Sequence, residues 1–325
     1  MDLIFLTYIN RSGSTYLAQL LSASDEVLVC PEAEILVHEF LEAPDKDFFL
    51  SDTSNNRLGY YLAEDWKLKH WGLKLEDLEF LSSVSRNIEA FRKLLSLYRD
   101  RIKPGATKII FKAERLIYLW KKLEKASQLS GNKIKLIAVI RDPRGIYASQ
   151  KNTIWPDSDR PFSRNLIKTG ILWYHYVKKI LHLISRRINI TLIRYEDLIK
   201  NPEGSLDNIA KRIRIRKISI QPDKGDFYDR IPVNQKPIHG NIRSQPIREK
   251  ENEWKDILNN LEIDLIQSVT GKAMKEMGYH LEKRKTSIFR LLKVKIPGVG
   301  MFYFNQCLAK IFFKINRLFH GRHGL

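Results

Sequence analysis

Short apolar runs alternate with segments of helical periodicity along most of this chain. Each run ends in polar residues, and the intervening segments place apolar side chains three or four positions apart, as in residues 160–187. Runs that are buried on both faces and separated by helices are typical of a parallel β-sheet. The predicted strands are 3–9, 27–30, 108–111, 136–140 and 190–194. The pattern therefore predicts a three-layer α/β/α fold, in which helices cover both faces of a mostly parallel sheet.

Three stretches depart from this alternation. Residues 35–103 are helical in pattern and mixed in polarity, which predicts a helical insertion that forms one wall of a site. Residues 219–248 are polar and lack periodicity, and a loop of this length inside a compact domain is usually functional. A basic segment closes the sequence. We therefore divide the chain into an α/β domain, 1–282, and a C-terminal extension, 283–325.

The first apolar run leads into Asn10-Arg11-Ser12-Gly13-Ser14-Thr15, after which apolar residues recur at helical spacing. In such a strand–loop–helix arrangement, backbone N–H groups and the positive end of the helix dipole converge, and hydroxyl groups add donors. The pattern predicts a phosphate or sulfate site with Arg11 as its cation. The loop is not a Walker A motif, because no Lys precedes Ser14 and no Gly opens the turn. A solvated turn in which a serine caps the helix is the alternative.

Polar side chains also follow three other predicted strands. Glu32 and Glu34 follow the second strand, Lys112 ends the third, and Arg141 ends the fourth, with Ser149 two turns into the next helix. Parallel α/β sheets bind ligands at the carboxyl ends of their strands, so these groups are candidates for chemistry there. Each group also has a structural interpretation. The glutamates would stabilise the first turn of a helix, Lys112 would be a solvated charge, and Arg141 would pair with a neighbouring acid.

The net charge of +19 favours anionic substrates or partners. Residues 284–325 contain nine Lys and Arg and no Asp or Glu, interleaved with Phe and Leu. A basic amphipathic segment of this composition fits an anionic membrane surface. Packing of the segment on the domain, or against a second subunit, explains the same pattern equally well.

The cysteine content and the chain's start favour a cytoplasmic protein. Cys30 and Cys307 are too few for a disulfide framework, and no basic leader precedes the first strand. No apolar run approaches the roughly 20 residues of a membrane-spanning helix. With the basic tail, we expect a cytoplasmic protein that is peripheral on the inner face of the membrane.

Together, these motifs resemble those of sulfotransferases that use 3′-phosphoadenosine 5′-phosphosulfate (PAPS), in the branch that includes the tyrosylprotein, bacterial glycan and Nod-factor enzymes. The loop from Arg11 to Thr15 resembles the one that holds the donor's 5′-phosphosulfate. The sequence Arg141-Asp142-Pro143-Arg144, with Ser149 eight residues after Arg141, resembles the 3′-phosphate motif. The resemblance covers about residues 2–280 and is weak between 34 and 103. It implies a P-loop-like α/β fold, PAPS as the donor co-substrate, and no metal ion.

The resemblance also implies donor contacts elsewhere in the chain. Tyr195 falls at a donor-contacting position, and Gly240 and Asn241 belong to a loop that resembles the one folding over the donor in bacterial relatives. In one departure, Thr153 stands where some relatives carry a second Arg. Binding of the 3′-phosphate would therefore depend on Arg141.

For catalysis, the resemblance implies a carboxylate and a lysine. Glu32 falls where tyrosylprotein sulfotransferases have the catalytic base, with Glu34 as the reserve candidate. Lys112 falls where they place a lysine that stabilises the transferring sulfuryl group. General-base catalysis by the glutamate, and stabilisation of developing negative charge by Lys112, Arg11 and the loop N–H groups, would then supply the rate enhancement.

We therefore expect transfer of a sulfuryl group from PAPS to an acceptor hydroxyl. The basic, Phe-rich tail favours a glycan or a lipid-linked sugar assembled at the membrane as the acceptor. Two other classes of protein are alternatives. A P-loop-type nucleotide kinase is disfavoured because the Walker lysine is absent, and a basic nucleic-acid-binding protein because no recognised motif accompanies the charge.

Overall fold

The computed structural model describes residues 2–44, 52–131, 134–155, 158, 160–218, 220–245 and 248–320. The chain forms two compact units, each discontinuous in sequence. The first comprises Met1–Arg141, Trp155–Asp159 and Lys179–Arg248, and the second comprises Asp142–Ile154, Arg160–Lys178 and Glu249–Leu325.

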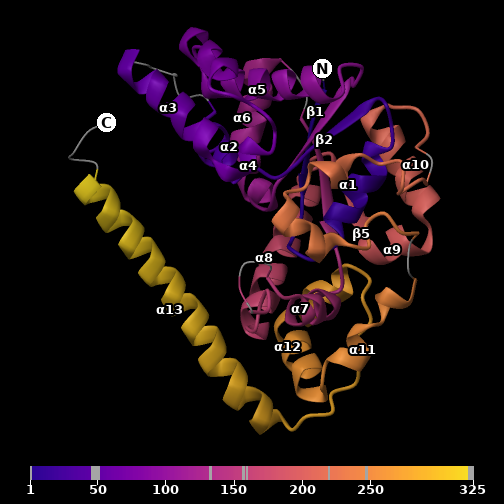
Figure 1. The fold of residues 1–325 in the computed structure, drawn as a ribbon. Helices are drawn as coiled ribbons and strands as arrows, with labels where there is room; N and C mark the ends of the chain where they lie inside the picture. The colour runs from indigo at the N-terminus through magenta and orange to yellow at the C-terminus, as the bar shows by residue number, and fades with distance from the viewer. Residues whose placement is uncertain are drawn as a thin grey trace. The chain divides into compact units, whose positions relative to one another are not determined.

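A five-stranded sheet forms the centre of the first unit (Figure 1). Its strands are β1 Asp2–Thr7, β2 Val27–Cys30, β3 Lys108–Lys112, β4 Lys135–Ile140 and β5 Ile190–Arg194. All neighbours pair in parallel, in the order β2-β3-β1-β4-β5. The register places Leu6 opposite Lys112, and Ile140 opposite Arg194, so the carboxyl ends of the strands meet at one edge. The prediction of a mostly parallel sheet is confirmed, with strand ends shifted by at most two residues.

Helices pack on both faces of this sheet. The helical segments of the first unit are α1 Ser14–Ser22, α2 Glu34–Leu36, η1 Val37–Leu41, α3 Asp52–Glu64, α4 Trp66–Lys69, η2 Glu76–Ser83, α5 Asn87–Ile102, η3 Glu114–Leu119, α6 Trp120–Ser130, α9 Tyr195–Lys200, α10 Pro202–Ile213, η4 Phe227–Arg230 and η5 Val233–His239. Ile4 and Leu6 enter a core shared with residues of α1 and α10. Phe5, on the other face, stacks on Phe91 of α5 with ring centroids 6.3 Å apart. This alternation is what the apolar pattern of a buried strand requires.

The segment 220–245 is the described part of the loop 219–248 that was predicted to be functional, and a buried side chain attaches it to α1. Gln19 is inaccessible to solvent, and its Nε2 donates to the carbonyl oxygens of Pro222 at 2.6 Å and Gly225 at 2.5 Å. Its Oε1 accepts from the backbone N–H of Tyr228 at 2.8 Å. A primary amide satisfies a donor and an acceptor of the loop backbone at once, which fixes the course of the loop over α1.

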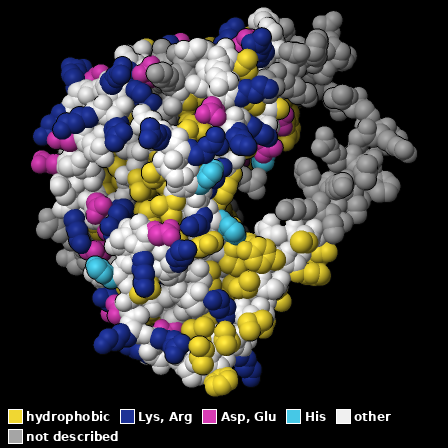
Figure 2. Space-filling model, turned by 180° about the vertical axis from the view of Figure 1, so that it is seen from behind, with side chains coloured by type: hydrophobic (Ala, Val, Ile, Leu, Met, Phe, Trp, Pro, Cys, Tyr) yellow, Lys and Arg dark blue, Asp and Glu magenta, His cyan; other side chains and the backbone are white. Residues whose placement is uncertain are grey.

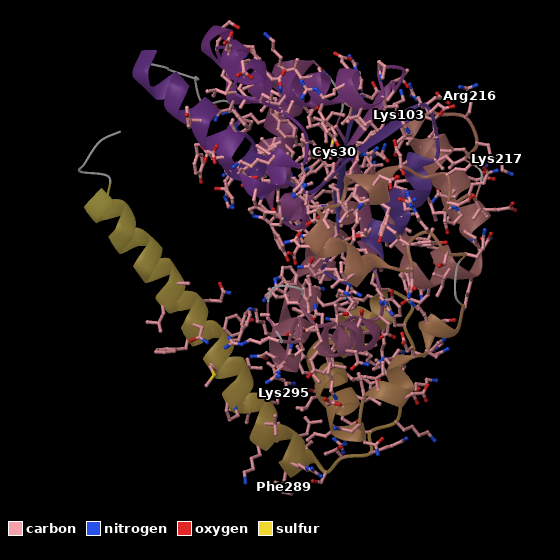
Figure 3. The ribbon with its side chains drawn as sticks, viewed as in Figure 1. Cys30, Lys103, Arg216, Lys217, Phe289 and Lys295 are labelled. Atoms are coloured by element: carbon pink, nitrogen blue, oxygen red, sulfur yellow. The ribbon has the colours of Figure 1, made fainter. Side chains whose placement is uncertain are left out.

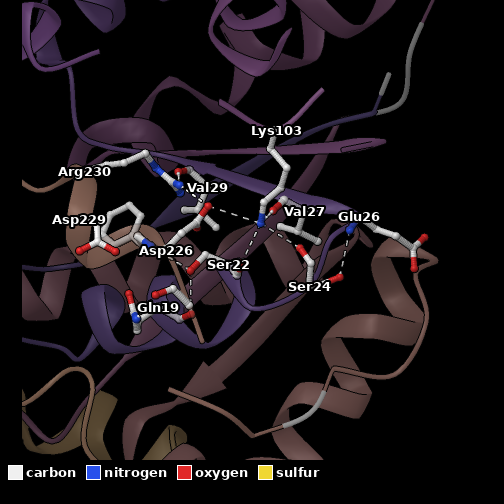
Figure 4. Close-up of polar contacts among 12 residues, drawn as sticks. Gln19, Ser22, Ser24, Glu26, Val27, Val29, Lys103, Asp226, Asp229 and Arg230 are labelled. Carbon is white, nitrogen blue, oxygen red and sulfur yellow. Dashed lines mark hydrogen bonds and ion pairs between the residues drawn. The ribbon is translucent and has the colours of Figure 1, made fainter. Parts of the chain in front are cut away.

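The basic charge of the chain is visible as Lys and Arg side chains scattered over the face shown in Figure 2. Lys103, labelled in Figure 3 with the buried Cys30, is one cation with a structural position. Its Nζ donates to the carbonyl oxygens of Ser22 at 2.8 Å and Ser24 at 3.2 Å, at the end of α1 (Figure 4). The ammonium group thus satisfies carbonyls that a helix C-terminus leaves without partners.

The second unit is helical. Its elements include α7 Pro143–Asn152, α11 Trp254–Ile257, α12 Asn260–Glu276 and α13 Ile288–His320, while α8 Leu166–Ser185 and η6 Arg248–Glu251 belong partly to each unit. Asp142 caps α7 by accepting from the N–H of Arg144 at 2.8 Å, and Pro143 occupies the first helical position, where its missing N–H costs no hydrogen bond. The carboxylate of Asp142 also pairs with the Arg144 guanidinium at 2.5 Å, and that guanidinium lies 4.0 Å from the ring centre of Trp254. Among the described helices, none is both long enough and apolar enough to cross a membrane.

Candidate functional site

The loop between β1 and α1 turns through two residues with positive φ, Arg11 at 70° and Gly13 at 86°. Gly13 is required here for two reasons. Its φ disfavours any residue with a Cβ, and a Cβ at this position would lie only 2.7 Å from Cε2 of Tyr195. The Tyr195 ring therefore packs directly on the loop backbone. Tyr195 begins α9 directly after β5, so two strand ends build this contact.

Donors converge on this loop. Gly13 is the N-cap of α1 and has no side chain, so the first N–H groups of the helix are not capped by one. The alternative of a serine helix cap is therefore wrong. Ser12 Oγ is buried and lacks a hydrogen-bond partner within the described parts of the chain, and Ser14 is also buried. Thr15 follows in the first turn. Free N–H groups at a helix N-terminus and a buried hydroxyl form a suitable environment for an anion.

Two arginines from different strand ends meet at the loop. Arg141, directly after β4, is buried, and its Nη1 donates to the carbonyl oxygen of Arg11 at 3.1 Å. The Arg141 guanidinium also lies 4.4 Å from the ring centre of Tyr195. Arg11 Nη1 in turn donates to the carbonyl oxygen of Ile238 in η5 at 3.1 Å. Burial, and then repulsion by Arg141, lower the pKa of Arg11 to about 10. An anion between the two guanidinium groups would relieve this repulsion.

A second cluster lies at the ends of β2 and β3. Lys112 is only 2% exposed, and its Nζ forms an ion pair with Glu32 Oε1 and lies 4.1 Å from the ring centre of Tyr8. Lys67, from α4 of the predicted helical insertion, has its Nζ 4.0 Å from Glu32 Oε2 and also pairs with Glu34. Two carboxylates and two ammonium groups therefore form one network, and the insertion contributes to it.

The charges in this cluster control its protonation. Burial disfavours the ionised form of Glu32, but the ammonium groups of Lys112 and Lys67 outweigh it, and the pKa of Glu32 falls to about 2. Burial, and then the Glu32 charge, hold the pKa of the Tyr8 hydroxyl well above its ordinary value. At neutral pH, Glu32 is thus an ionised carboxylate and Tyr8 a neutral phenol.

His239 belongs to the same predicted loop as Gly240 and Asn241, but the sequence assigned it no role of its own. It ends η5, next to the Ile238 carbonyl that Arg11 contacts, and its pKa is lowered to about 3 by burial and then by the charges of Lys112 and Arg11. A charge from each cluster therefore affects the protonation of His239. In the sequence it stood out only as a neighbour of Gly240, and Lys67 and Tyr8 carried no signal of their own.

The structure brings some of the predicted residues together. The first cluster consists of Arg11, Ser12, Gly13, Arg141 and Tyr195. In the second cluster, Glu32 forms an ion pair with Lys112. Gly240 and Asn241 are exposed and follow η5, whose Ile238 contacts Arg11. Ser149 lies on α7 in the second unit, where its carbonyl oxygen accepts from Thr153 Oγ1 at 2.7 Å. Within the described ranges, no group of three or more His, Cys, Asp or Glu side chains is placed to hold a metal ion.

Two solved structures have a similar fold. One is the sulfotransferase domain from the curacin biosynthetic pathway, with 18% sequence identity and a TM-score of 0.56, covering 86% of this chain and 99% of that domain. The other is the sulfotransferase domain from the Synechococcus PCC 7002 olefin synthase, with 17% identity and a TM-score of 0.59, covering 86% of this chain and 95% of that domain. At these identities the likeness concerns the fold, which is the P-loop-like α/β arrangement expected from the sequence.

Sequence comparison gives the family directly. No curated protein matches this chain. The family model described as "Sulfotransferase family", however, matches residues 4–217, a range that holds both arginine-bearing strand ends and the Glu32–Lys112 pair. This match sets aside the kinase and nucleic-acid-binding alternatives. The chain belongs to the sulfotransferase family, and it is a sulfotransferase.

Proposed function

We propose that this enzyme transfers the sulfuryl group of PAPS, the donor generally used by its family, to a hydroxyl group of an acceptor. The loop from Arg11 to Thr15 would hold the 5′-phosphosulfate, and Arg141, with Ser149, the 3′-phosphate. Tyr195, Gly240 and Asn241 would complete the donor site. The observation that carries this proposal is the loop at the N-terminus of α1, where Arg141 donates to the Arg11 carbonyl oxygen and the buried Ser12 hydroxyl has no partner in the described structure. The Arg141 charge also contributes to the lowered pKa of Arg11. These groups fit a highly charged anion.

Glu32 would act as the general base, accepting the proton of the acceptor hydroxyl on a carboxylate oxygen. The donor supplies the electrophilic sulfur and a phosphate leaving group. Lys112 Nζ, Arg11 and the loop N–H groups would stabilise negative charge as it develops, which is usually the largest contribution in such transfers. Glu34 is the second candidate for the base, because it shares Lys67 with Glu32.

A carboxylate with a pKa of about 2 is ionised at neutral pH, yet it is a weak base while two ammonium groups neutralise it. In our proposal, Lys112 turns from Glu32 toward the sulfuryl oxygens when the donor is bound. The ammonium group of Lys112 then interacts with the donor and stabilises the ionised Glu32 carboxylate less. The pKa of Glu32 rises in consequence, and the group becomes a better base at the moment it is needed.

The acceptor we propose is a glycan or a lipid-linked sugar. Exposed aromatic side chains on the helical insertion support this class: Trp66 is 46% exposed, and Tyr60 and Tyr61 are more exposed still. Lys67 connects this surface to the site, because its Nζ lies 5.5 Å from the ring centre of Trp66 and 4.0 Å from Glu32. Amphipathic aromatic rings next to a base suit the apolar face of a sugar ring. We place the enzyme in the cytoplasm, peripheral to the membrane, a location with which two free cysteines are compatible.

Calorimetric titration with adenosine 3′,5′-bisphosphate, the donor product, tests the donor site. We expect tight binding by the wild type, and affinity about 10- to 100-fold weaker for Arg141→Ala, because a charge-assisted hydrogen-bond donor to phosphate is lost. Arg216→Ala, which removes the same charge from a side chain that is 85% exposed, is the matched control and should bind like the wild type. Equal binding by wild type and Arg141→Ala, or a preference for ATP with Mg²⁺, would contradict the proposal.

A further inference from the structure

Helix α13 packs on its own unit along only one stripe. Leu291 is buried in a hydrophobic core that includes Ile167, and Lys295 Nζ donates to the carbonyl oxygen of Ser268 in α12 at 2.8 Å. About two turns after Leu291, a Cβ added to Gly298 would lie 3.0 Å from Ile167, so helix and unit approach closely there. Phe302 continues the same stripe, packed against the core. These contacts fix the N-terminal half of the helix to the unit.

The other sides of α13 expose large apolar side chains. Phe289 is 83% exposed, Ile296 65% and Phe304 63%, and Met301 and Leu308 are also exposed. Figure 2 shows hydrophobic side chains gathered along this helix, and Figure 3 labels Phe289 near its start. A monomeric soluble protein rarely leaves so many large apolar side chains together in water, so a surface of this kind marks an interaction site.

Charge is distributed along this segment in a specific order. Arg284, Lys285, Arg290, Lys293 and Lys295 come first, and residues 296–309 then carry no charge at all. Cations resume after that stretch, although the side chains of Lys310, Lys314 and Arg317, and all of Arg322, lie outside the described residues. As a helix, residues 296–309 extend over about 21 Å, which is shorter than the roughly 30 Å hydrocarbon core of a bilayer. Uncharged helices of this length are more typical of an interfacial segment than of a membrane span.

We propose that α13 docks the enzyme on an anionic lipid bilayer. The exposed apolar side chains of residues 289–308 would enter the boundary between headgroups and acyl chains, and Arg290 and Lys293 would bind anionic headgroups. Charge complementarity decides between a bilayer and a second copy of this chain. Residues 284–325 contain cations and no acid, so two copies of the helix would repel each other, whereas an anionic surface attracts every one of them.

Flotation of the full-length protein with lipid vesicles tests this inference without reference to donor binding or turnover. We expect binding to an equal mixture of phosphatidylcholine and phosphatidylglycerol, and much weaker binding to phosphatidylcholine alone. Arg290→Gln/Lys293→Gln should bind the mixture about 30-fold more weakly, because each cation near the surface contributes about fivefold. Lys121→Gln/Lys122→Gln, the same charge change at exposed positions of α6, is the matched control and should bind like the wild type. Equal losses in the two variants would overturn the proposal, since net charge alone would then explain binding.

A second variant tests the apolar contribution. Phe289→Ser/Phe304→Ser should weaken binding to the mixture at least tenfold, because burial of a single Phe ring in the interface already changes the binding constant by about that much. Both side chains are exposed, so the circular dichroism and thermal unfolding of this variant should match those of the wild type. If the wild type does not float, and instead sediments as a dimer that this variant converts to a monomer, the exposed surface binds a second copy and the bilayer proposal is wrong.

Discussion

The cluster at the Arg11–Thr15 loop and the Glu32–Lys112 cluster belong to the same unit but distribute charge in opposite ways. At the loop, Arg11 and Arg141 lie close enough for mutual repulsion to contribute to lowering the pKa of Arg11 to about 10. In the other cluster, Lys112 and Lys67 compensate Glu32, and the pKa of this carboxyl falls to about 2. In the proposed function, a bound anion would stabilise the first arrangement, whereas the second already pairs its carboxylates with ammonium groups.

Under the proposed function, the two clusters divide the work of a sulfotransferase between them. A site with excess positive charge gains free energy when a polyanion binds, so it suits a donor and retains its product as well. A site with compensated charge gains little free energy from binding an anion. The pKa of its carboxylate rises strongly, however, when one of the neighbouring cations moves to another group. Mutations in the first cluster should therefore change affinity for the donor product, and mutations in the second should change turnover.

Glu32→Gln is expected to give the largest separation of the two effects. Turnover should fall by about 10²- to 10⁴-fold, the usual contribution of a general base, while affinity for adenosine 3′,5′-bisphosphate should change by less than about twofold. Turnover is measured as the steady-state rate at which sulfated acceptor forms. Calorimetry on the same preparation measures the affinity for adenosine 3′,5′-bisphosphate.

Glu34→Gln is the control for this prediction, because Glu34 shares Lys67 but its side chain is 49% exposed. It should keep most of its turnover. A greater loss in Glu34→Gln than in Glu32→Gln would assign the base to Glu34. A parallel loss of affinity and turnover in Glu32→Gln would give Glu32 a structural role instead.

Gly13→Ala should weaken affinity for the donor product about tenfold or more. The added Cβ meets the Tyr195 ring, so either the loop or the ring that supports Arg141 must move. Gly131→Ala separates this steric effect from backbone strain. Gly131 also has a positive φ, 66°, but a Cβ there would have no atom within 4 Å. Both variants should lose about 1 kcal/mol of stability from strain, and only Gly13→Ala should lose affinity, as measured by thermal unfolding and calorimetry.

His239 should produce the smallest effect, and it connects the two clusters. Its pKa of about 3 lies below the ordinary value of 6.5 because of burial and then the charges of Lys112 and Arg11. Between these two values the folded protein binds fewer protons at this site than the unfolded chain, so stability from His239 is present above pH 6.5 and is lost as pH falls toward 3. A bound anion would offset the two cations and raise the pKa of His239.

Binding of the donor product at a pH between these values should therefore take up a fraction of a proton. Calorimetry in two buffers with different ionisation enthalpies measures this uptake. His239→Gln should reduce it, whereas His70→Gln, at an exposed histidine, should not. Unchanged uptake in His239→Gln would mean that another group near the anion site titrates.

The sheet and the anion loop were predictable because their signals are local. An apolar run such as 136–140 cannot remain exposed, and a strand that breaks into Ser-Gly-Ser before a helical pattern has few other conformations. The strand ends then placed Lys112 and Arg141 at one edge of the sheet by topology alone.

The contacts that complete the site were not predictable. Tyr195 packs on Gly13, Lys67 reaches Glu32 from the helical insertion, and Ile238 binds Arg11, and each contact joins distant parts of the chain. No spacing or composition encodes such pairings, because they depend on how helices and loops pack after the sheet has formed. The roles assigned to single residues remain predictions for the same reason.

The contact of Gln19 with the segment 220–245 has a consequence for biosynthesis. The amide on the first helix finds its partners about two hundred residues later, near Pro222, Gly225 and Tyr228. A nascent chain that has emerged only as far as residue 217, where the family match ends, already contains the anion loop but cannot satisfy the buried Gln19. The contacts of Gln19 can therefore form only after residues 222–228 have left the ribosome, so the packing of the segment 220–245 on α1 is a late event in the folding of this enzyme.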